Sequence, residues 1–206
     1  MIEEISVKNK SLIYTANLLN LTFFSRDEHD YLKNLILNIP DQQSKSTNVK
    51  ADMTQWHMHL QDKVFKKLSD IVINNCLSQM PVTQTQDPKP FIYQNDAVWG
   101  ASYGKGEYTQ SHNHWPFAWS WCYYLSMPEG ASPIVFPDCN HCFFPKEGDL
   151  ILFDGSLQHE VPKCDCEEKR VMVAGNIGIV PNIVQFNDSI KVVQMDDGMV
   201  ISKRDN

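Results

Sequence analysis

The sequence predicts an α+β protein with a mainly β core and helices in its N-terminal third. In two segments before Pro88, apolar residues recur at helical spacing. From Pro88 onward, short apolar runs alternate with Gly, Pro and Asn, which is typical of the short strands of a sandwich or barrel. No internal repeat or low-complexity linker interrupts the chain. We therefore expect one compact domain, with residues 1–87 as a helical region packed on a β core of residues 88–206.

The first expected helix begins after Ser25, a favourable N-cap residue, and Glu28 completes a capping box three positions later. Apolar residues then follow at helical spacing until Pro40, which cannot continue a helix. A second helix is expected from about Gln55 to Gln79, because its apolar residues form one stripe opposite a charged face. The apolar positions of the two helices are Tyr31, Leu32, Leu35 and Ile36, then Val64, Phe65, Leu68, Ile71, Val72 and Cys76.

The expected strands are short apolar runs with turn residues between them. They are Phe91–Tyr93, Val98–Trp99, Trp121–Leu125, Ile134–Phe136, Leu150–Phe153 and Val171–Ala174. After Pro181 come two further apolar pairs, Val192–Val193 and Val200–Ile201, for which we expect edge strands.

Charge and hydropathy narrow the possible partners of this chain of 206 residues. Its net charge of −7 argues against a nucleic-acid surface, because phosphate binding normally needs a basic footprint. No apolar run approaches the ~20 residues that span a bilayer. The first residues mix acids and lysines, unlike a secretory signal. We therefore expect a cytoplasmic protein with no membrane partner.

Histidines provide the main indication of chemistry. In the triplet His112-Asn113-His114, side chains at i and i+2 of a strand would project from the same face, so both imidazoles could reach one metal ion. A third imidazole from His159 could complete the set. Arg170 follows, and its guanidinium is suited to binding the carboxylate of an organic co-substrate.

These residues belong to a longer ordered pattern, which extends from about Trp99 to Ile177. Its members are Tyr103-x-x-Gly106, Tyr108, His112-x-His114, Ser120, Tyr123-Tyr124-Leu125, Pro128, Pro145-x-x-Gly148-Asp149, Phe153, His159, Arg170 and Asn176. The pattern resembles the Fe(II)/2-oxoglutarate-dependent oxygenases, and most of all their prolyl-hydroxylase-like branch with its small bacterial and phage relatives. The resemblance implies a double-stranded β-helix, a jelly-roll or cupin-like barrel with helices packed outside the larger sheet.

The resemblance also implies the metal ligands. His112 and His159 match the two histidine ligands of the family, and His114 stands where the family usually has Asp or Glu. By resemblance His114 becomes the third ligand of Fe(II), which leaves three positions for 2-oxoglutarate and O2. The change removes one negative charge from the site. If His114 turned aside instead, the metal would have a vacant position.

The co-substrate residues follow from the same resemblance. Arg170 lies eleven positions after His159 (170 − 159 = 11), where the family places the arginine that binds the distal carboxylate of 2-oxoglutarate. Tyr124 matches a tyrosine that bonds the same carboxylate, and Ser120 and Tyr103 are expected to line its pocket. The implied reaction hydroxylates a C–H bond of a peptidyl or small-molecule substrate and converts 2-oxoglutarate to succinate.

Two other functions stay open. A cupin-type dioxygenase uses three histidines and no 2-oxoglutarate, but the glutamate of the first cupin motif is absent and Arg170 would have no role. A catalytically degenerate metal-binding module would explain the missing carboxylate. The sequence does not predict the substrate or the oligomeric state.

The remaining metal-ligating residues are weaker candidates. Cys139 and Cys142 form a CxxC, and Cys164 and Cys166 form a CxC, so a shared structural zinc is conceivable. On the family's fold the two pairs would lie at opposite ends of the barrel, so we favour free thiols in two surface loops. A second metal site at His57-x-His59 is not expected, since residues i and i+2 do not face each other on a helix.

Overall fold

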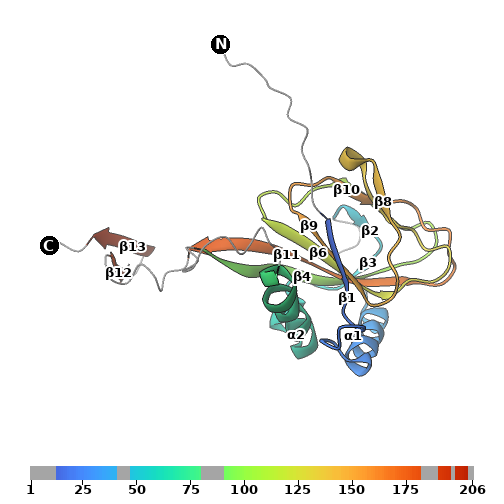
Figure 1. The fold of residues 1–206 in the computed structure, drawn as a ribbon, viewed down its shortest axis with the longest axis horizontal. Coiled ribbons are helices and arrows are strands. Elements are labelled where there is room, and N and C mark those ends of the chain that lie inside the picture. The colour runs from blue at the N-terminus through green and yellow to red at the C-terminus, as the bar shows by residue number, and fades with distance from the viewer. Residues whose placement is uncertain (1–12, 41–46, 80–90, 182–189, 196–197, 204–206) are drawn as a thin grey trace, which may run out of the picture.

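The computed structural model describes residues 13–40, 47–79, 91–181, 190–195 and 198–203. The core consists of two antiparallel sheets with few helices (Figure 1). The larger sheet contains, in spatial order, β1 (Ile13–Asn17), β9 (Asp149–Asp154), β6 (Trp119–Ser126), β11 (Arg170–Pro181), β4 (Phe91–Tyr103) and β3 (Asp52–Met53). The smaller sheet contains β2 (Val49–Lys50), β5 (Tyr108–His112), β10 (His159–Val161), β7 (Ile134–Phe136) and β8 (His141–Phe143). The prediction of a mainly β core is confirmed.

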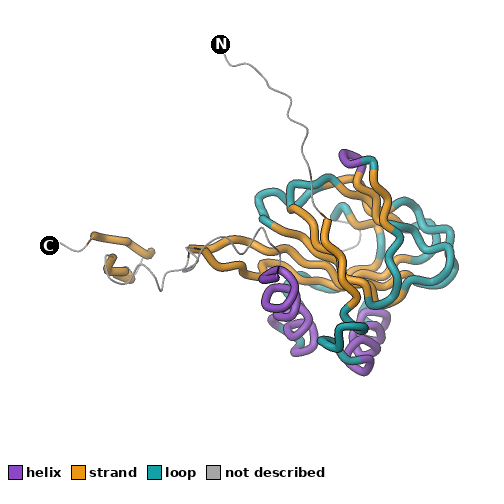
Figure 2. The backbone as a smooth tube through the Cα atoms, in the orientation of Figure 1, coloured by secondary structure: helices purple, strands orange, loops and turns teal. Residues whose placement is uncertain are grey.

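The larger sheet is buried on both faces, and this divides the core into two layers. On β6, Trp121 and Tyr123 belong to the layer that packs against the helices α1 (Arg26–Asn38) and α2 (Lys63–Ile71). Tyr124, on the opposite face, belongs to the layer shared with the smaller sheet. Figure 2 shows the helices on one side of the larger sheet, while the strands of the smaller sheet lie on the other. Cys122 and Tyr124 of β6 and Met172 and Ala174 of β11 therefore face the space between the sheets.

The first helix begins as the sequence indicates. Glu28 donates its backbone N–H to Ser25 Oγ at 3.3 Å and accepts from the Ser25 N–H at 3.0 Å, so the capping box is present. The helix ends at Asn38, two residues before Pro40. The second helix is shorter than expected. It begins at Lys63 rather than near Gln55, because Asp62 caps it and its carboxylate accepts from two backbone N–H groups.

The segment before this second helix cannot be α-helical, since His57 has a positive φ of 63°. A 3-10 turn at Met58–Leu60 follows instead, and after α2 the chain continues through a π-helical turn at Val72–Cys76 and a 3-10 turn at Leu77–Gln79. Three strands also lie in the N-terminal region that we expected to be helical. β1 pairs with β9, β2 with β5, and β3 with β4. The division of the chain after residue 87 stays a prediction.

The C-terminal strands do not extend either large sheet. β12 (Ile190–Met195) pairs with β13 (Gly198–Lys203) as a separate two-stranded sheet. The expectation that they form edge strands of the core is therefore wrong. In the described part of the chain, no helix is long and apolar enough to cross a membrane.

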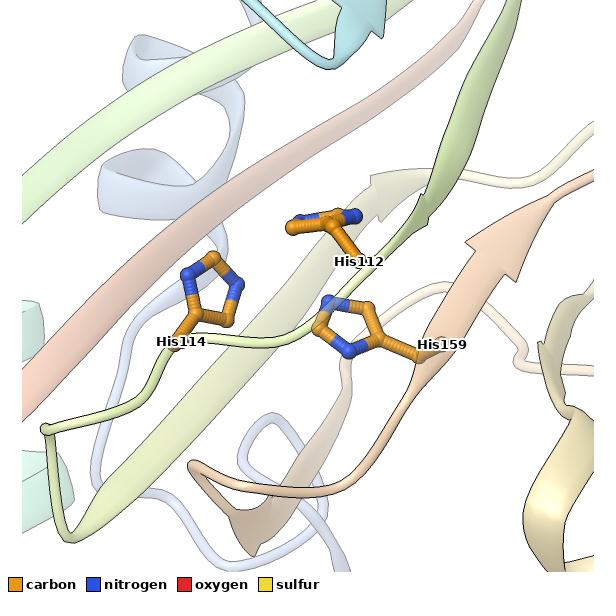
Figure 3. A group of neighbouring side chains, drawn as sticks. All are labelled: His112, His114 and His159. Carbon is orange, nitrogen blue, oxygen red and sulfur yellow. The ribbon is translucent and has the colours of Figure 1, made fainter.

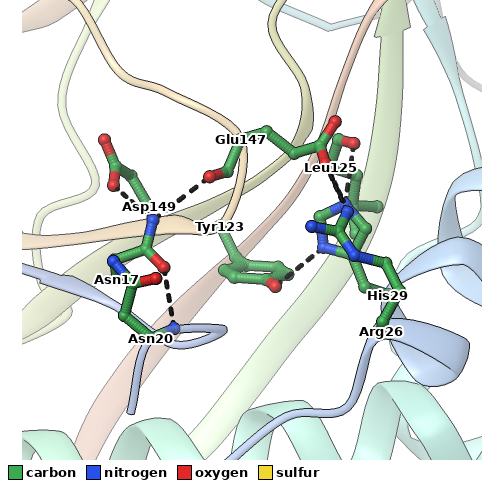
Figure 4. A network of polar contacts seen from close by, with 8 residues as sticks. All are labelled: Asn17, Asn20, Arg26, His29, Tyr123, Leu125, Glu147 and Asp149. Atoms are coloured by element: carbon green, nitrogen blue, oxygen red, sulfur yellow. Dashed lines mark hydrogen bonds and ion pairs between the residues drawn. The ribbon is translucent and has the colours of Figure 1, made fainter. Parts of the chain in front are cut away.

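A buried histidine joins α1 to the larger sheet (Figure 4). His29 is fully buried, its Nδ1 lies 2.8 Å from the Tyr123 hydroxyl, and its Nε2 lies 3.0 Å from the Leu125 carbonyl oxygen. Burial lowers the pKa of His29, so the ring is held neutral, although the nearby Glu147 opposes this shift. Arg26 forms an ion pair with Glu147 beside it. This network fixes the helix on the face of β6 that points away from the space between the sheets.

Candidate metal centre

The structure brings His112, His114 and His159 together between the two sheets (Figure 3). One ligand atom from each lies within 4.8 Å of those of the other two. His112 ends β5 and pairs directly with His159 at the start of β10, with ring centroids 4.3 Å apart. The ring of His114 lies 4.8 Å from that of His112 and 5.0 Å from that of His159. Within the described ranges this is the only cluster of three or more potential metal ligands.

His114 reaches the cluster from a loop and not from a strand. β5 ends at His112, so the expectation that both histidines project from one strand face is wrong for His114. The His114 N–H donates to the Gly155 carbonyl at 2.7 Å, and the Gly155 N–H donates to the Ala118 carbonyl at 3.1 Å. A Cβ at Gly155 would overlap the Phe117 carbonyl oxygen. The loop after His114 and the turn before His159 are therefore interlocked around this glycine.

Hydrogen bonds at Nδ1 set the tautomers of two of the rings. His112 Nδ1 lies 2.8 Å from the Gln110 carbonyl oxygen, and His159 Nδ1 lies 3.0 Å from the Leu157 carbonyl oxygen. A carbonyl oxygen can only accept, so in both rings the proton is on Nδ1 and the lone pair is on Nε2. Neutral imidazoles fixed in this way are typical of metal ligands.

Burial keeps the cluster neutral. It lowers the pKa of His114 to about 2, with His159 and His112 adding to the effect, and that of His159 to about 4, with His112 adding to it. The pKa of His112 is also lowered by burial, against the opposing hydrogen bond to Gln110. Because the neutral imidazole is the form that binds a metal, the site is poised for a cation at neutral pH.

Arg170 lies in the same pocket, and its guanidinium makes no hydrogen bond to the other residues that the structure describes. It is fully buried, and its Nε and both terminal nitrogens lack acceptors. The guanidinium carbon lies 4.6 Å from the centre of the Tyr103 ring and 5.2 Å from that of Tyr124. The Tyr124 hydroxyl is also buried, and the Tyr124 ring contacts the same guanidinium. An unpaired buried cation is costly, so this end of the pocket is suited to an anion that accepts hydrogen bonds.

Two other residues of the predicted site bond within the protein. The Tyr103 hydroxyl lies 2.8 Å from Thr109 Oγ1, and its ring contacts the Arg170 guanidinium. Ser120 Oγ donates to Asn176 Oδ1 at 3.0 Å, and Asn176 Nδ2 lies 3.3 Å from His114 Nδ1. The sequence pattern included Asn176 but assigned it no role, since nothing in the spacing shows that β6 and β11 place it behind His114.

The weaker metal candidates belong to no cluster of three or more potential ligands among the described residues. The four cysteines of the CxxC and CxC motifs are free thiols. None of them belongs to a metal-ligand cluster in the described chain. Cys139 and Cys142 are exposed, whereas Cys164 is fully buried, so the expectation of surface thiols is wrong for Cys164. The rings of His57 and His59 lie 6.1 Å apart, and no third ligand among the described residues joins them.

Solved structures with this fold include several oxygenases. The viral collagen prolyl hydroxylase of Paramecium bursaria Chlorella virus-1 is 20% identical, with a TM-score of 0.60 over 80% of this chain and 94% of that chain. The prolyl-4-hydroxylase of Pseudomonas putida is 14% identical, with a TM-score of 0.54 over 81% and 91%. HygX from Streptomyces hygroscopicus, solved with nickel, 2-oxoglutarate and hygromycin B, is 13% identical, with a TM-score of 0.54 over 82% and 83%.

The fold is therefore that of the 2-oxoglutarate/Fe(II) oxygenases, and the resemblance seen in the sequence is confirmed at this level. No family model matches the sequence. No curated protein matches it either.

Proposed function

We propose that this protein is an Fe(II)- and 2-oxoglutarate-dependent dioxygenase built on a double-stranded β-helix. It hydroxylates a C–H bond of a peptidyl or small-molecule substrate. The observation that carries the proposal is the unpaired, fully buried Arg170, which shares one pocket with the cluster of His112, His114 and His159. A metal cluster alone fits many functions, but a buried cation beside it calls for an organic anion.

The three histidines would hold Fe(II) through Nε2. The donor set fits the metal, since imidazole nitrogens suit iron and three protein ligands leave open positions for a co-substrate. With O2, the iron and 2-oxoglutarate together supply the oxidation of the C–H bond, while 2-oxoglutarate loses CO2 and becomes succinate. The protein ligands carry no charge, in contrast to a set with one carboxylate. The bound anions alone would therefore neutralise the metal.

Arg170 and Tyr124 would hold the distal carboxylate of 2-oxoglutarate. The guanidinium offers two parallel N–H donors to the carboxylate, and the Tyr124 hydroxyl offers a third. The Tyr103 ring supports the guanidinium from one side, and the Tyr103 hydroxyl is itself held by Thr109. Binding would thus satisfy the donors that lack partners, and their desolvation is already complete before the anion arrives.

Two measurements test the proposal. Anaerobic addition of Fe(II) and 2-oxoglutarate is expected to give a weak visible charge-transfer band, and aerobic turnover with candidate substrates is expected to give one succinate per product. Arg170→Met should abolish the binding of 2-oxoglutarate, and with it the formation of succinate, while Ni(II) still binds. Substrate turnover without succinate would favour a three-histidine, cupin-type dioxygenase. Metal binding with no band and no effect of 2-oxoglutarate on Tm would favour a non-catalytic module.

A further inference from the structure

Asn176 holds the side chain of His114 in a way that differs from the support of the other two histidines. The Nδ1 atoms of His112 and His159 bond to main-chain carbonyls two residues earlier, at Gln110 and Leu157. His114 Nδ1 instead lies 3.3 Å from the amide of Asn176, a side chain of another strand. Among the described hydrogen bonds at the Nδ1 atoms of the three rings, that of His114 is the one made to a side chain.

The support for His114 is itself buried and bonded. Asn176 on β11 pairs in register with Ser120 on β6, and Ser120 Oγ donates to Asn176 Oδ1 at 3.0 Å. Ser120 is 1% exposed and Asn176 5%. Polar groups at such depth are costly unless they are bonded, and this pair makes its hydrogen bonds within the protein. The hydroxyl of Ser120 therefore supports the amide of Asn176.

We propose that Asn176 is a positioning residue for the third metal ligand, fixing the ring of His114 so that its Nε2 faces His112 and His159. This inference rests on the metal site of the proposed function but not on its chemistry. His114 is in a loop, so its backbone does not orient its ring as a strand would. The amide of Asn176 fixes the ring plane from behind, and Ser120 fixes the amide.

The hydrogen bond between Asn176 and His114 can adapt to the change of His114 tautomer that metal binding requires. With the amide nitrogen facing Nδ1, as the structure has it, Nδ1 accepts and the proton of His114 is on Nε2. A metal at Nε2 requires that proton to move to Nδ1, which must then donate. A half-turn of the Asn176 amide presents Oδ1 to Nδ1–H and Nδ2 to Ser120 Oγ, which can accept as well as donate. Asn176 can thus support either tautomer, whereas an apolar side chain can support neither.

Metal affinity without catalysis tests this role. By calorimetry with Ni(II), Asn176→Leu is expected to weaken binding about 10–100-fold, as loss of such supporting bonds typically does. Ser120→Ala should weaken it less, because the amide remains. Asn176→Asp should keep the Ni(II) affinity that Asn176→Leu loses, because a carboxylate accepts from Nδ1–H. The control is Asn95→Leu, which removes an amide bonded to the Ser69 carbonyl, away from the three rings, and should leave Ni(II) affinity unchanged.

A spectroscopic measurement separates positioning from general destabilisation. In the Zn(II)-loaded protein with ¹⁵N-labelled histidine, the Nδ1–H signals of all three rings should be protected from exchange. Asn176→Leu should lose that of His114 alone. Ni(II) affinity within threefold of wild type in a folded Asn176→Leu variant would overturn the proposal. If that variant does not fold, Ser120→Ala with an unchanged His114 signal and unchanged affinity would overturn it instead.

The failure of this inference can be told apart from that of the proposed function. If the wild type forms no succinate but Asn176→Leu still weakens Ni(II) binding, the role of Asn176 stands and the dioxygenase assignment falls. If succinate forms and Asn176→Leu binds Ni(II) as tightly as the wild type does, the dioxygenase assignment stands and the role of Asn176 falls.

Discussion

The backbone N–H of His114 donates to the carbonyl oxygen of Gly155 at 2.7 Å, and this bond joins the two chain segments that bring histidines into the cluster. Gly155 lies in the turn between β9 and β10, four residues before His159. A loop ligand is thereby tied to the segment that leads to a strand ligand. The position of His114 relative to His159 thus depends on main-chain contacts at a glycine.

Replacement of this glycine should disturb both stability and metal binding. In Gly155→Ala the new Cβ would overlap the Phe117 carbonyl oxygen, so the two segments must move apart. We expect a loss of about 1–3 kcal/mol in the free energy of unfolding and weaker Ni(II) binding. Denaturant unfolding and calorimetry measure the two effects. Gly178→Ala is the matched control, since its Cβ would meet no atom within 4 Å. Unchanged Ni(II) affinity in Gly155→Ala would contradict the claim that main-chain contacts at Gly155 position His114.

Arg170→Met should stabilise the ligand-free protein while removing its response to the co-substrate. Methionine fills a similar volume without an unpaired buried charge, so we expect a gain of about 1–4 kcal/mol, reduced by the loss of contacts with the rings of Tyr103 and Tyr124. Thermal unfolding with and without 2-oxoglutarate tests both parts. Arg26→Met, at an exposed ion pair, should change stability by at most about 1 kcal/mol and keep the response. A response to 2-oxoglutarate that survives Arg170→Met would contradict the assigned role.

Without metal, the protein should lose stability as the pH falls below about 6.5. The pKa values of His112, His114 and His159 are lowered in the folded state, so the unfolded chain binds more protons below its own value of about 6.5. The loss continues as pH falls toward the folded pKa of about 4 for His159 and about 2 for His114. Melting curves between pH 8 and 4 measure it. His114→Leu should show a shallower decline, and an equally steep decline would assign the effect to other groups.

His29→Phe should destabilise the fold without affecting the metal site. The substitution leaves the Tyr123 hydroxyl and the Leu125 carbonyl without a partner on the helix side of β6, which costs about 1–3 kcal/mol. Ni(II) affinity should not change, since the three histidines lie on the other side of the larger sheet. The double variant His29→Phe/Tyr123→Phe should recover part of the loss, because one orphaned group is removed. No recovery would mean that the Tyr123 bond is not the source of the cost.

The sequence predicted those helices and strands that depend on neighbouring residues, such as a helix cap or an apolar run. The capping box of Ser25 and Glu28 placed the start of α1, and the apolar runs placed β4, β6, β9 and β11 of the larger sheet and β7 of the smaller one. The two-residue strands β2 and β3 have no periodicity of their own and depend on pairing with β5 and β4, so they were missed. The double-stranded β-helix itself stays a prediction that rests on the resemblance.

The candidate site divides in the same way. The spacing of His112, His114 and His159 predicted a cluster that the structure brings together. The sequence could not show that Ser120 bonds to Asn176, or that Asn176 stands behind His114, because these contacts depend on the register of β6 against β11. Residues that only position a ligand residue leave no recognisable spacing in the sequence.

The two halves of the pocket come from different sheets. His112 and His159 belong to the smaller sheet, and Arg170 to the larger one. In the proposed function, one end of the co-substrate meets the metal and the other meets Arg170, so the molecule bridges the gap between the sheets. The distance between the two sheets then selects dicarboxylic acids by their length. An acid one carbon shorter or longer than 2-oxoglutarate would reach only one of its two anchors.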